Sequence, residues 1–147
     1  MKEKRIYFDM DGTIADLYGV ENWLEDIINR NVRPYAVAKP LVNLSLLARY
    51  LHILQSKGYK VGVITWLAKN STDDYDAKVT ATKKEWLEKR LPSVEFDEIH
   101  VIKYGTPKSS VGCGILFDDE EPNRNEWSGV AYDVDNIIEI LKALAKG

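Results

Sequence analysis

The chain has 147 residues, of which 45% are apolar, and its formal net charge is −3. The length and the apolar content favour one domain with one core, spanning residues 1–147. The net negative charge gives no sign of a basic surface for long nucleic acid, although a small anion can still bind locally. The single cysteine, Cys113, excludes an intrachain disulfide. The apolar run after residues 1–5 is too short for a signal peptide or a membrane span. We therefore expect a soluble, cytoplasmic protein without a membrane partner.

The first predicted strand is the apolar run 6–8, and two aspartates follow it. Asp9 and Asp11 are two residues apart, and on an extended backbone that spacing points both carboxylates the same way. Gly12 allows the chain to turn sharply, and Thr13 offers a hydroxyl and a backbone N–H. A solvated turn is the simpler interpretation, but such turns rarely follow a fully apolar run. Because two close carboxylates repel each other, we expect a hard divalent cation with oxygen ligands between them.

A small helical insert is predicted after this turn, at about residues 15–40. Residues 20–31 carry apolar side chains at a helical period, whereas Pro34 and Pro40 predict a non-helical return segment. This length suits one helix and a loop but not a separate domain, so we expect a rather open pocket beneath it. The aromatic residues of the insert are Tyr18, Trp23 and Tyr35. They either line that pocket or pin the insert onto the body of the domain, and both interpretations stay open.

A helix over 41–57 and a strand over 59–66 come next. Leucines recur through the helix at helical spacing, and Gly58 is well placed to cap its C-terminus. A strand, a helix and a second strand in this order form a right-handed crossover in a parallel sheet. Thr65 ends its strand at the edge where open α/β sheets bind ligands. Trp66, directly after it, either stacks on a bound base or fills the core, and we favour the core.

A longer helix is predicted over 73–90, followed by a third strand within 96–102. The mixed charges of the helix indicate a solvated outer face. Its candidate buried stripe consists of Tyr75, Val79, Trp86 and Leu87. His100 lies inside the alternating run of the third strand and His52 inside the preceding helix, so we interpret both histidines as structural.

The apolar run 115–117 repeats the arrangement of the first strand, because Asp118 and Asp119 follow it directly. A charged surface turn would leave the exit of a buried strand unexplained. A short strand over 129–132 and an amphipathic helix over 134–145 complete the chain. We therefore predict a doubly wound α/β fold with a mostly parallel, five-stranded, Rossmann-like sheet, whose carboxylate-bearing strand ends meet at one edge.

These motifs are similar, in type and in order, to those of the haloacid dehalogenase (HAD) superfamily, whose members are mostly phosphohydrolases. The run Asp-Met-Asp-Gly-Thr at 9–13 resembles the first motif, Thr65 the second, and the pair at 118–119 the fourth, so the resemblance spans nearly the whole chain. It implies that Asp9 attacks phosphorus. It also implies that Asp11 acts first as general acid and then as general base.

The same resemblance implies a metal site and a phosphate site. Mg²⁺ would be held by Asp9, by the backbone carbonyl of Asp11 and by Asp119. Asp118 would have a supporting or water-mediated role in this metal site. The hydroxyl of Thr65 would bind a phosphate oxygen of a small phosphorylated substrate.

Two lysines, Lys103 and Lys108, compete for the role of the fixed cation that phosphoryl transfer needs. Lys108 stands ten residues before Asp118. This separation leaves no room for a full helix and is similar to that in the 5′(3′)-deoxyribonucleotidase branch of the superfamily, so we favour Lys108. The chain departs from that branch in its smaller, cap-like insert and in Trp66, which stands where those enzymes carry a small residue.

The sequence therefore predicts a Mg²⁺-dependent phosphatase that hydrolyses a phosphate monoester, with nucleotides among the candidate substrates, through an aspartyl-phosphate. A phosphatase that acts on nucleic-acid ends is an alternative, against which the absence of a basic patch argues. A non-catalytic protein that binds phosphate or regulates a partner is another, but the intact acidic set disfavours it. A receiver-type signalling domain fits less well, because no aspartate follows the middle strand at 61–64.

Overall fold

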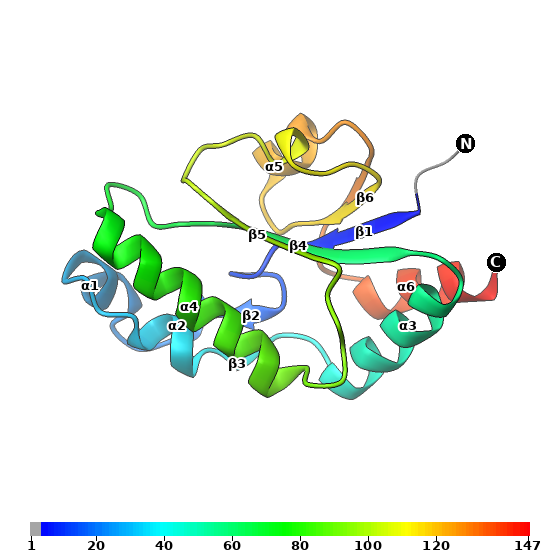
Figure 1. The fold of residues 1–147 in the computed structure, drawn as a ribbon, viewed down its shortest axis with the longest axis horizontal. Helices are drawn as coiled ribbons and strands as arrows, with labels where there is room; N and C mark the ends of the chain where they lie inside the picture. The colour runs from blue at the N-terminus through cyan, green and yellow to red at the C-terminus, as the bar shows by residue number, and fades with distance from the viewer. Residues whose placement is uncertain (1–3) are drawn as a thin grey trace.

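A five-stranded parallel sheet runs through the centre of the computed structural model, which describes residues 4–147 (Figure 1). Residues 1–3 of the predicted 1–147 domain lie outside the described residues. The strands are β1 (Arg5–Phe8), β4 (Lys60–Trp66), β5 (Glu98–Ile102), β6 (Ile115–Phe117) and β7 (Val130–Tyr132). They lie in the order β5-β4-β1-β6-β7, and each neighbouring pair is parallel. The predicted α/β fold with a parallel five-stranded sheet is therefore confirmed.

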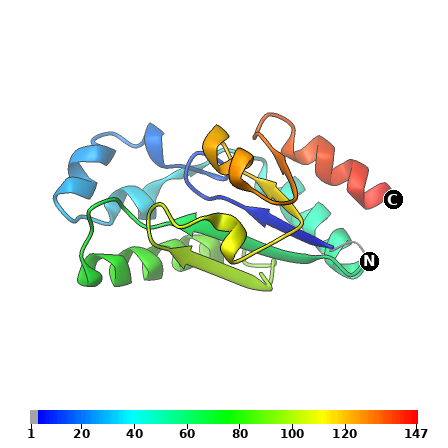
Figure 2. The ribbon, with the colours of Figure 1, turned by 90° about the horizontal axis from the view of Figure 1, so that it is seen from above.

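The register of the central strands brings their carboxyl ends to one edge. Phe8 of β1 lies opposite Val63 of β4 on one side and Phe117 of β6 on the other. The central strands are continuous apolar runs because both faces of a parallel sheet are buried. Figure 2 shows the strands pointing toward the insert, which is drawn in blue and cyan. The residues that follow β1, β4 and β6 therefore lie beneath the insert.

Helices cover the two faces of the sheet unequally (Figure 1). They are α3 (Leu44–Ser56), α4 (Asp73–Arg90), α5 (Glu121–Glu126) and α6 (Ile137–Lys146). Helices α3, α4 and α6 bury Ile6 and Phe8 in the main core, whereas Tyr7 and Trp127 belong to a smaller core on the opposite face. Strand β1 contributes to both cores because its alternate side chains point to opposite faces. Within residues 4–147, no helix is long and apolar enough to cross a membrane.

The two long helices begin at residues whose side chains cap them. The Asn43 side chain accepts a hydrogen bond from the Leu46 N–H at 3.0 Å at the start of α3. The Thr72 hydroxyl accepts one from the Tyr75 N–H at 3.3 Å at the start of α4. Such caps satisfy backbone donors that have no partner within the helix. Gly58, with a φ of +93°, follows the end of α3, and α4 has the predicted bounds 73–90.

The insert after β1 contains two short helices rather than one. Its elements are β2 (Ala15–Asp16), a 3₁₀ turn (Leu17–Gly19), α1 (Trp23–Ile28), α2 (Arg33–Val37) and β3 (Lys39–Pro40). The predicted helix over 20–31 is therefore shorter than expected. The prediction that the segment from Pro34 to Pro40 is non-helical is wrong, because Pro34 lies in the first turn of α2, where its missing N–H breaks no helical hydrogen bond. Strands β2 and β3 pair antiparallel at the base of the insert.

Three hydrogen bonds to backbone carbonyls fasten the insert to the body of the domain. Each measures 2.8 Å, and they run from Tyr75 Oη to Asn31, from Trp86 Nε1 to Ala38, and from Arg30 Nη2 to Asn70. The buried ring of Tyr35 packs into a cluster with Leu17, Tyr75 and Val79. The insert is thus held against α4 as a wall beside the carboxyl edge of the sheet.

Candidate active site

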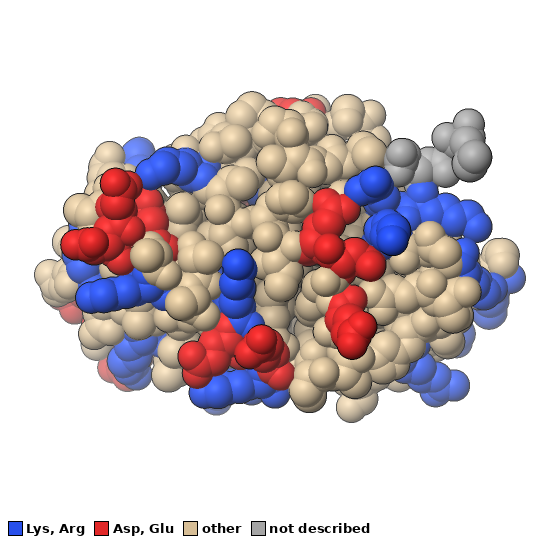
Figure 3. Space-filling view, in the orientation of Figure 1, with Lys and Arg blue, Asp and Glu red and all other residues tan. Residues whose placement is uncertain are grey.

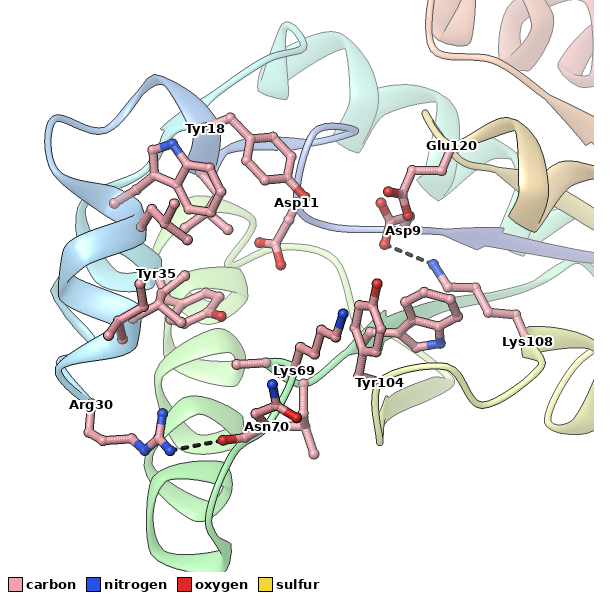
Figure 4. Close-up of a pocket in the computed structure, with 18 residues that line it drawn as sticks. Asp9, Asp11, Tyr18, Arg30, Tyr35, Lys69, Asn70, Tyr104, Lys108 and Glu120 are labelled. Carbon is pink, nitrogen blue, oxygen red and sulfur yellow. Dashed lines mark hydrogen bonds and ion pairs between the residues drawn. The ribbon is translucent and has the colours of Figure 1, made fainter.

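Four aspartates gather where β1 and β6 end. The backbone N–H of Asp9 donates to the Phe117 carbonyl at 2.9 Å, so the chain segments that follow the two strands remain side by side. Asp9, Asp118 and Asp119 each offer a carboxylate oxygen, and these oxygens lie within 4.8 Å of one another. Asp11 lies on the following turn and points into the adjoining cavity (Figure 4).

The turn after β1 fits tightly against Asp119. Gly12 has a φ of +83°, and a Cβ at this position would overlap the Asp119 carboxylate. Only glycine meets both requirements without strain. The hydroxyl of Thr13 lies 3.2 Å from an oxygen of Asp9 and 3.2 Å from an oxygen of Asp119, so its single hydrogen serves one of them at a time. The turn therefore sets the separation of these two carboxylates.

Lys108 is the buried cation of the acidic cluster. Its Nζ lies 2.8 Å from Asp9 Oδ1 and 2.7 Å from Asp118 Oδ2, and only 1% of its side chain is exposed. Burial alone would lower the pKa of Lys108, but the two carboxylates outweigh burial and raise it above its ordinary value. Lys103, in contrast, is 71% exposed and pairs with Asp76 at 3.3 Å. Of the two candidate lysines, Lys108 is the one that the structure places against the aspartates.

The cluster holds more negative charge than Lys108 can compensate. Burial raises the pKa of Asp9 to about 7, with Lys108 opposing the shift and Asp11 adding to it. Burial is also the main cause of the raised pKa values of Asp118 and Asp119. Buried carboxylates that converge in this way are the oxygen ligands that Mg²⁺ takes in proteins. The donor set therefore fits a hard divalent cation.

Asp118 and Asp119 differ in how many hydrogen bonds their carboxylate oxygens accept from the protein. Its Oδ2 accepts hydrogen bonds from Lys108 and, at 3.2 Å, from Asn123, and its Oδ1 accepts the Glu120 N–H at 3.0 Å. Asp119 accepts the Thr13 hydroxyl at 3.2 Å, and its other side-chain hydrogen bond, to Asp9, exists only while Asp9 is protonated. Asp119 thus retains more free lone pairs than Asp118.

Thr65 and Lys83 form a second polar pair at the same edge of the sheet. Thr65 is fully buried at the end of β4, and its Oγ1 accepts a hydrogen bond from Lys83 Nζ at 2.6 Å. The same ammonium donates to the Trp66 carbonyl at 2.8 Å and to Asp11 Oδ2 at 3.0 Å. The two predicted site residues Asp11 and Thr65 are thus joined through a lysine.

Lys83 is the site residue that the sequence analysis missed. The mixed charges of 73–90 predict a solvated face, and for Lys83 this is wrong, because only 1% of its side chain is exposed. It comes four residues after Val79 and three before Trp86, so it lies on the buried stripe of α4. A lysine at a stripe position is the signal that could have revealed it. His52 and His100 bond to Ser93 and Glu98 and lie outside the cavity.

Trp66 is a wall of the cavity rather than part of the core. The prediction that it fills the core is wrong, because its half-buried ring lines the cavity, and the ring centroid lies 5.7 Å from Lys108 Nζ. Its Nε1–H donates to the Thr106 carbonyl at 2.8 Å, and its ring centroid lies 5.0 Å from that of Tyr104. These contacts fix an aromatic surface at the mouth of the site.

The cavity between the insert and the sheet edge has a volume of about 650 Å³. Asp9, Asp11 and Lys108 form one end of it, and Arg30 lies at the other end (Figure 4). Lys69 lies between them, with its Nζ 5.9 Å from the ring centroid of Tyr104. The insert contributes the aromatic rings of Tyr18, Trp23 and Tyr35. Both interpretations of these rings apply, since buried Tyr35 pins the insert while all three line the cavity.

Comparison with known proteins identifies the fold. No protein-family model and no curated protein sequence matches the chain. Its structure is similar to the crystal structure of a D,D-heptose 1,7-bisphosphate phosphatase from Burkholderia thailandensis, with a TM-score of 0.54 over 99% of this chain and 100% of that chain. The two sequences are 11% identical, so this likeness shows a shared fold.

Proposed function

We propose that the protein is a Mg²⁺-dependent phosphatase of the HAD superfamily that hydrolyses a phosphate monoester through an aspartyl-phosphate. The observation that carries this proposal is the position of the Asp9 carboxylate. It directly follows β1, lies beside Lys108, lines the cavity and has Asp11 two residues away. Three motifs in the order of that superfamily and a fold shared with a phosphatase support it.

The residues divide the reaction into two displacements. A carboxylate oxygen of Asp9 forms a bond to phosphorus while the bond to the leaving oxygen breaks, and Asp11 gives that oxygen its proton. Water then attacks phosphorus, its proton passes to Asp11, and the bond between phosphorus and Asp9 breaks. Lys108 and the hydroxyl of Thr65 hold phosphoryl oxygens in place during both steps.

Mg²⁺ in this site would be held by the Asp9 carboxylate, the backbone carbonyl of Asp11 and the Asp119 carboxylate. Asp118, whose oxygens already accept hydrogen bonds from Lys108, Asn123 and Glu120, would support the site rather than bind directly. When bound, the ion offsets negative charge so that an anionic nucleophile can approach an anionic phosphate.

The shape of the cavity favours a small phosphorylated substrate, and a nucleotide is our specific proposal. A volume of about 650 Å³ is that of a small-molecule site. The fixed pair of Trp66 and Tyr104 presents an aromatic surface on which a base can stack. On the face shown in Figure 3, groups of Lys and Arg lie near groups of Asp and Glu on a mostly uncharged surface, which does not favour a long polynucleotide. We also propose a cytoplasmic location, since the chain has one cysteine.

A panel of phosphate monoesters tests the proposal. Nucleoside 5′- and 3′-monophosphates, sugar phosphates and p-nitrophenyl phosphate are assayed with Mg²⁺ and with EDTA, beside Asp9→Asn. We expect Mg²⁺-dependent release of phosphate by the wild type, highest with nucleotides, and none by the variant. Binding of these esters without release would favour the non-catalytic alternative. Release from 5′-phosphorylated oligonucleotides but not from mononucleotides would favour a polynucleotide-end phosphatase.

A further inference from the structure

The buried ammonium of Lys83 makes polar contacts with two of the proposed site residues, Asp11 and Thr65. Its Nζ donates to Asp11 Oδ2, Thr65 Oγ1 and the Trp66 carbonyl at 3.0, 2.6 and 2.8 Å, which uses all three ammonium hydrogens. Its Nζ also lies 5.1 Å from the ring centroid of Tyr35 in the insert. A buried charge is costly unless it is fully paired, and here the pairing is complete.

The contact with Thr65 determines the direction of a hydroxyl hydrogen. Because Thr65 Oγ1 accepts a hydrogen from Lys83, its own hydrogen must point elsewhere. Within residues 4–147, the Thr65 hydroxyl donates to no acceptor, and the side chain is fully buried at the edge of the sheet. The direction of this hydrogen is therefore not set by any acceptor among the described residues, and in the proposed reaction it would go to a phosphoryl oxygen.

The contact with Asp11 determines which carboxylate oxygen is free. Lys83 holds Asp11 Oδ2, whereas Oδ1 accepts no hydrogen bond from the described residues. Asp11 points into the cavity, and its side chain is 16% exposed (Figure 4). The lysine thus fixes the rotamer of Asp11 and leaves one oxygen for a proton transfer.

We propose that Lys83 is a positioning residue that holds the Asp11 acid and the Thr65 phosphate donor in one fixed geometry, so that the proton and the phosphoryl group are aligned together. This inference rests on the proposed function, because it assigns Lys83 a role through Asp11 and Thr65 in that reaction. Lys83 does not touch the reacting atoms; Lys108 remains the cation beside the nucleophile.

The test uses two substrates that differ in their need for a general acid. p-Nitrophenyl phosphate has a leaving group that departs without protonation, whereas glycerol 2-phosphate needs a proton. Lys83→Met keeps most of the side-chain volume but removes the ammonium, and Lys84→Met, at the exposed neighbouring position, is the matched control. If Lys83 positions the acid, kcat should fall by about 100-fold for glycerol 2-phosphate and by about tenfold for p-nitrophenyl phosphate. Lys84→Met should leave both within about twofold of the wild type.

A double variant separates positioning from a structural role. In Asp11→Asn the acid is absent, so adding Lys83→Met should cause no further change in the ratio of the two kcat values. Equal losses for both substrates in Lys83→Met, or an additive change in the double variant, would overturn the role of Lys83. If Lys83→Met does not fold, Lys83→Arg decides, because it keeps the charge but changes its geometry and should still lower the rate with glycerol 2-phosphate more. An unchanged ratio in Lys83→Arg would overturn the role. A wild type that hydrolyses neither these two esters nor any nucleoside monophosphate overturns the proposed function and this role with it.

Discussion

Lys108 Nζ lies 2.8 Å from Asp9 Oδ1, and both side chains are buried at the end of β1. The ammonium therefore compensates a carboxylate that burial would otherwise keep protonated. Replacing Lys108 by Met should reduce kcat by about 100-fold or more, because a fixed charge beside the nucleophile and the phosphate is lost. Steady-state kinetics measures the effect, and circular dichroism checks the fold.

Lys103→Met is the control for this change, since Lys103 is exposed and contacts Asp73 and Asp76 outside the acidic cluster. It should leave kcat within about twofold of the wild type. If Lys103→Met is the inactive variant and Lys108→Met keeps its activity, the assignment of the phosphate lysine is wrong.

Metal binding should stabilise the protein through Asp119. Because Mg²⁺ binds the folded state, a concentration of about 100 times Kd adds roughly 2.7 kcal/mol to the free energy of unfolding, and the melting temperature should rise accordingly. Asp119→Asn should abolish most of that rise. Glu121→Gln, an exposed carboxylate at the start of α5, should keep it. Differential scanning calorimetry with and without Mg²⁺ makes the comparison, and an equal rise in Asp119→Asn would contradict the proposed ligand set.

The hydrogen bond from Trp86 is one of the three that fasten the insert, and its loss should loosen the insert. Trp86→Phe removes the donor to the Ala38 carbonyl and should lower the free energy of unfolding by about 1–3 kcal/mol. Trp127→Phe removes a similar hydrogen bond, to the Gly114 carbonyl at 2.9 Å, in the core on the other face of the sheet. Both variants should lose stability, but only Trp86→Phe should raise KM, because only it loosens a wall of the cavity. Equal KM values would show that the insert does not help to hold the substrate.

A carboxylate far from the site should control acid stability. Burial alone would raise the pKa of Glu98, but hydrogen bonds from His100 and Tyr7 and the charge of Arg5 together lower it below its ordinary value of 4.5. A lowered pKa in the folded state stabilises the protein above pH 4.5, and this contribution is lost as the pH falls through the folded value.

The stability difference between wild type and Glu98→Gln should therefore be present above pH 4.5 and shrink as the pH falls below 4.5. Urea titrations at several pH values measure it. Glu88→Gln, an exposed carboxylate on α4, should show no such trend. A difference that grows as the pH falls below 4.5 would contradict the direction of the shift.

The sheet and its acidic edge could be predicted because their signals are local. An apolar run that ends in aspartates identifies both a buried strand and the edge at which it ends, and this pattern occurs at Asp9 and again at Asp118. The α4 helix had clear signals at both ends, so its bounds were predictable.

The remaining features depend on contacts that a local pattern does not contain. From the sequence alone, Lys83 is expected to be a solvated charge. Its burial depends on contacts with Asp11 and Thr65, which are distant in the sequence. The sequence around Trp66 is compatible with a ring in the core or in the cavity. The hydrogen bond from its Nε1 to the Thr106 carbonyl holds the ring at the cavity, and this contact is not visible in the local sequence. Pro34 is compatible with a loop or with the first turn of a helix, and packing of α2 on α4 favours the helix.

Asp9 should carry the phosphoryl group between the two displacements. Asp11→Asn keeps Asp9 and the backbone carbonyl that would bind Mg²⁺, but it removes the group that activates water for the second displacement. With p-nitrophenyl phosphate, which needs little help from a general acid, phosphorylation should survive better than hydrolysis in this variant. The phospho-enzyme should therefore accumulate.

Rapid-quench mass spectrometry of Asp11→Asn, mixed with p-nitrophenyl phosphate and Mg²⁺, measures this directly, with Asp9→Asn as the control. We predict one added phosphate on the peptide that contains Asp9 in the Asp11→Asn variant, and none in the Asp9→Asn variant. If the wild type hydrolyses the ester while neither it nor Asp11→Asn ever carries phosphate on Asp9, water attacks the substrate directly and the mechanism proposed for Asp9 is wrong.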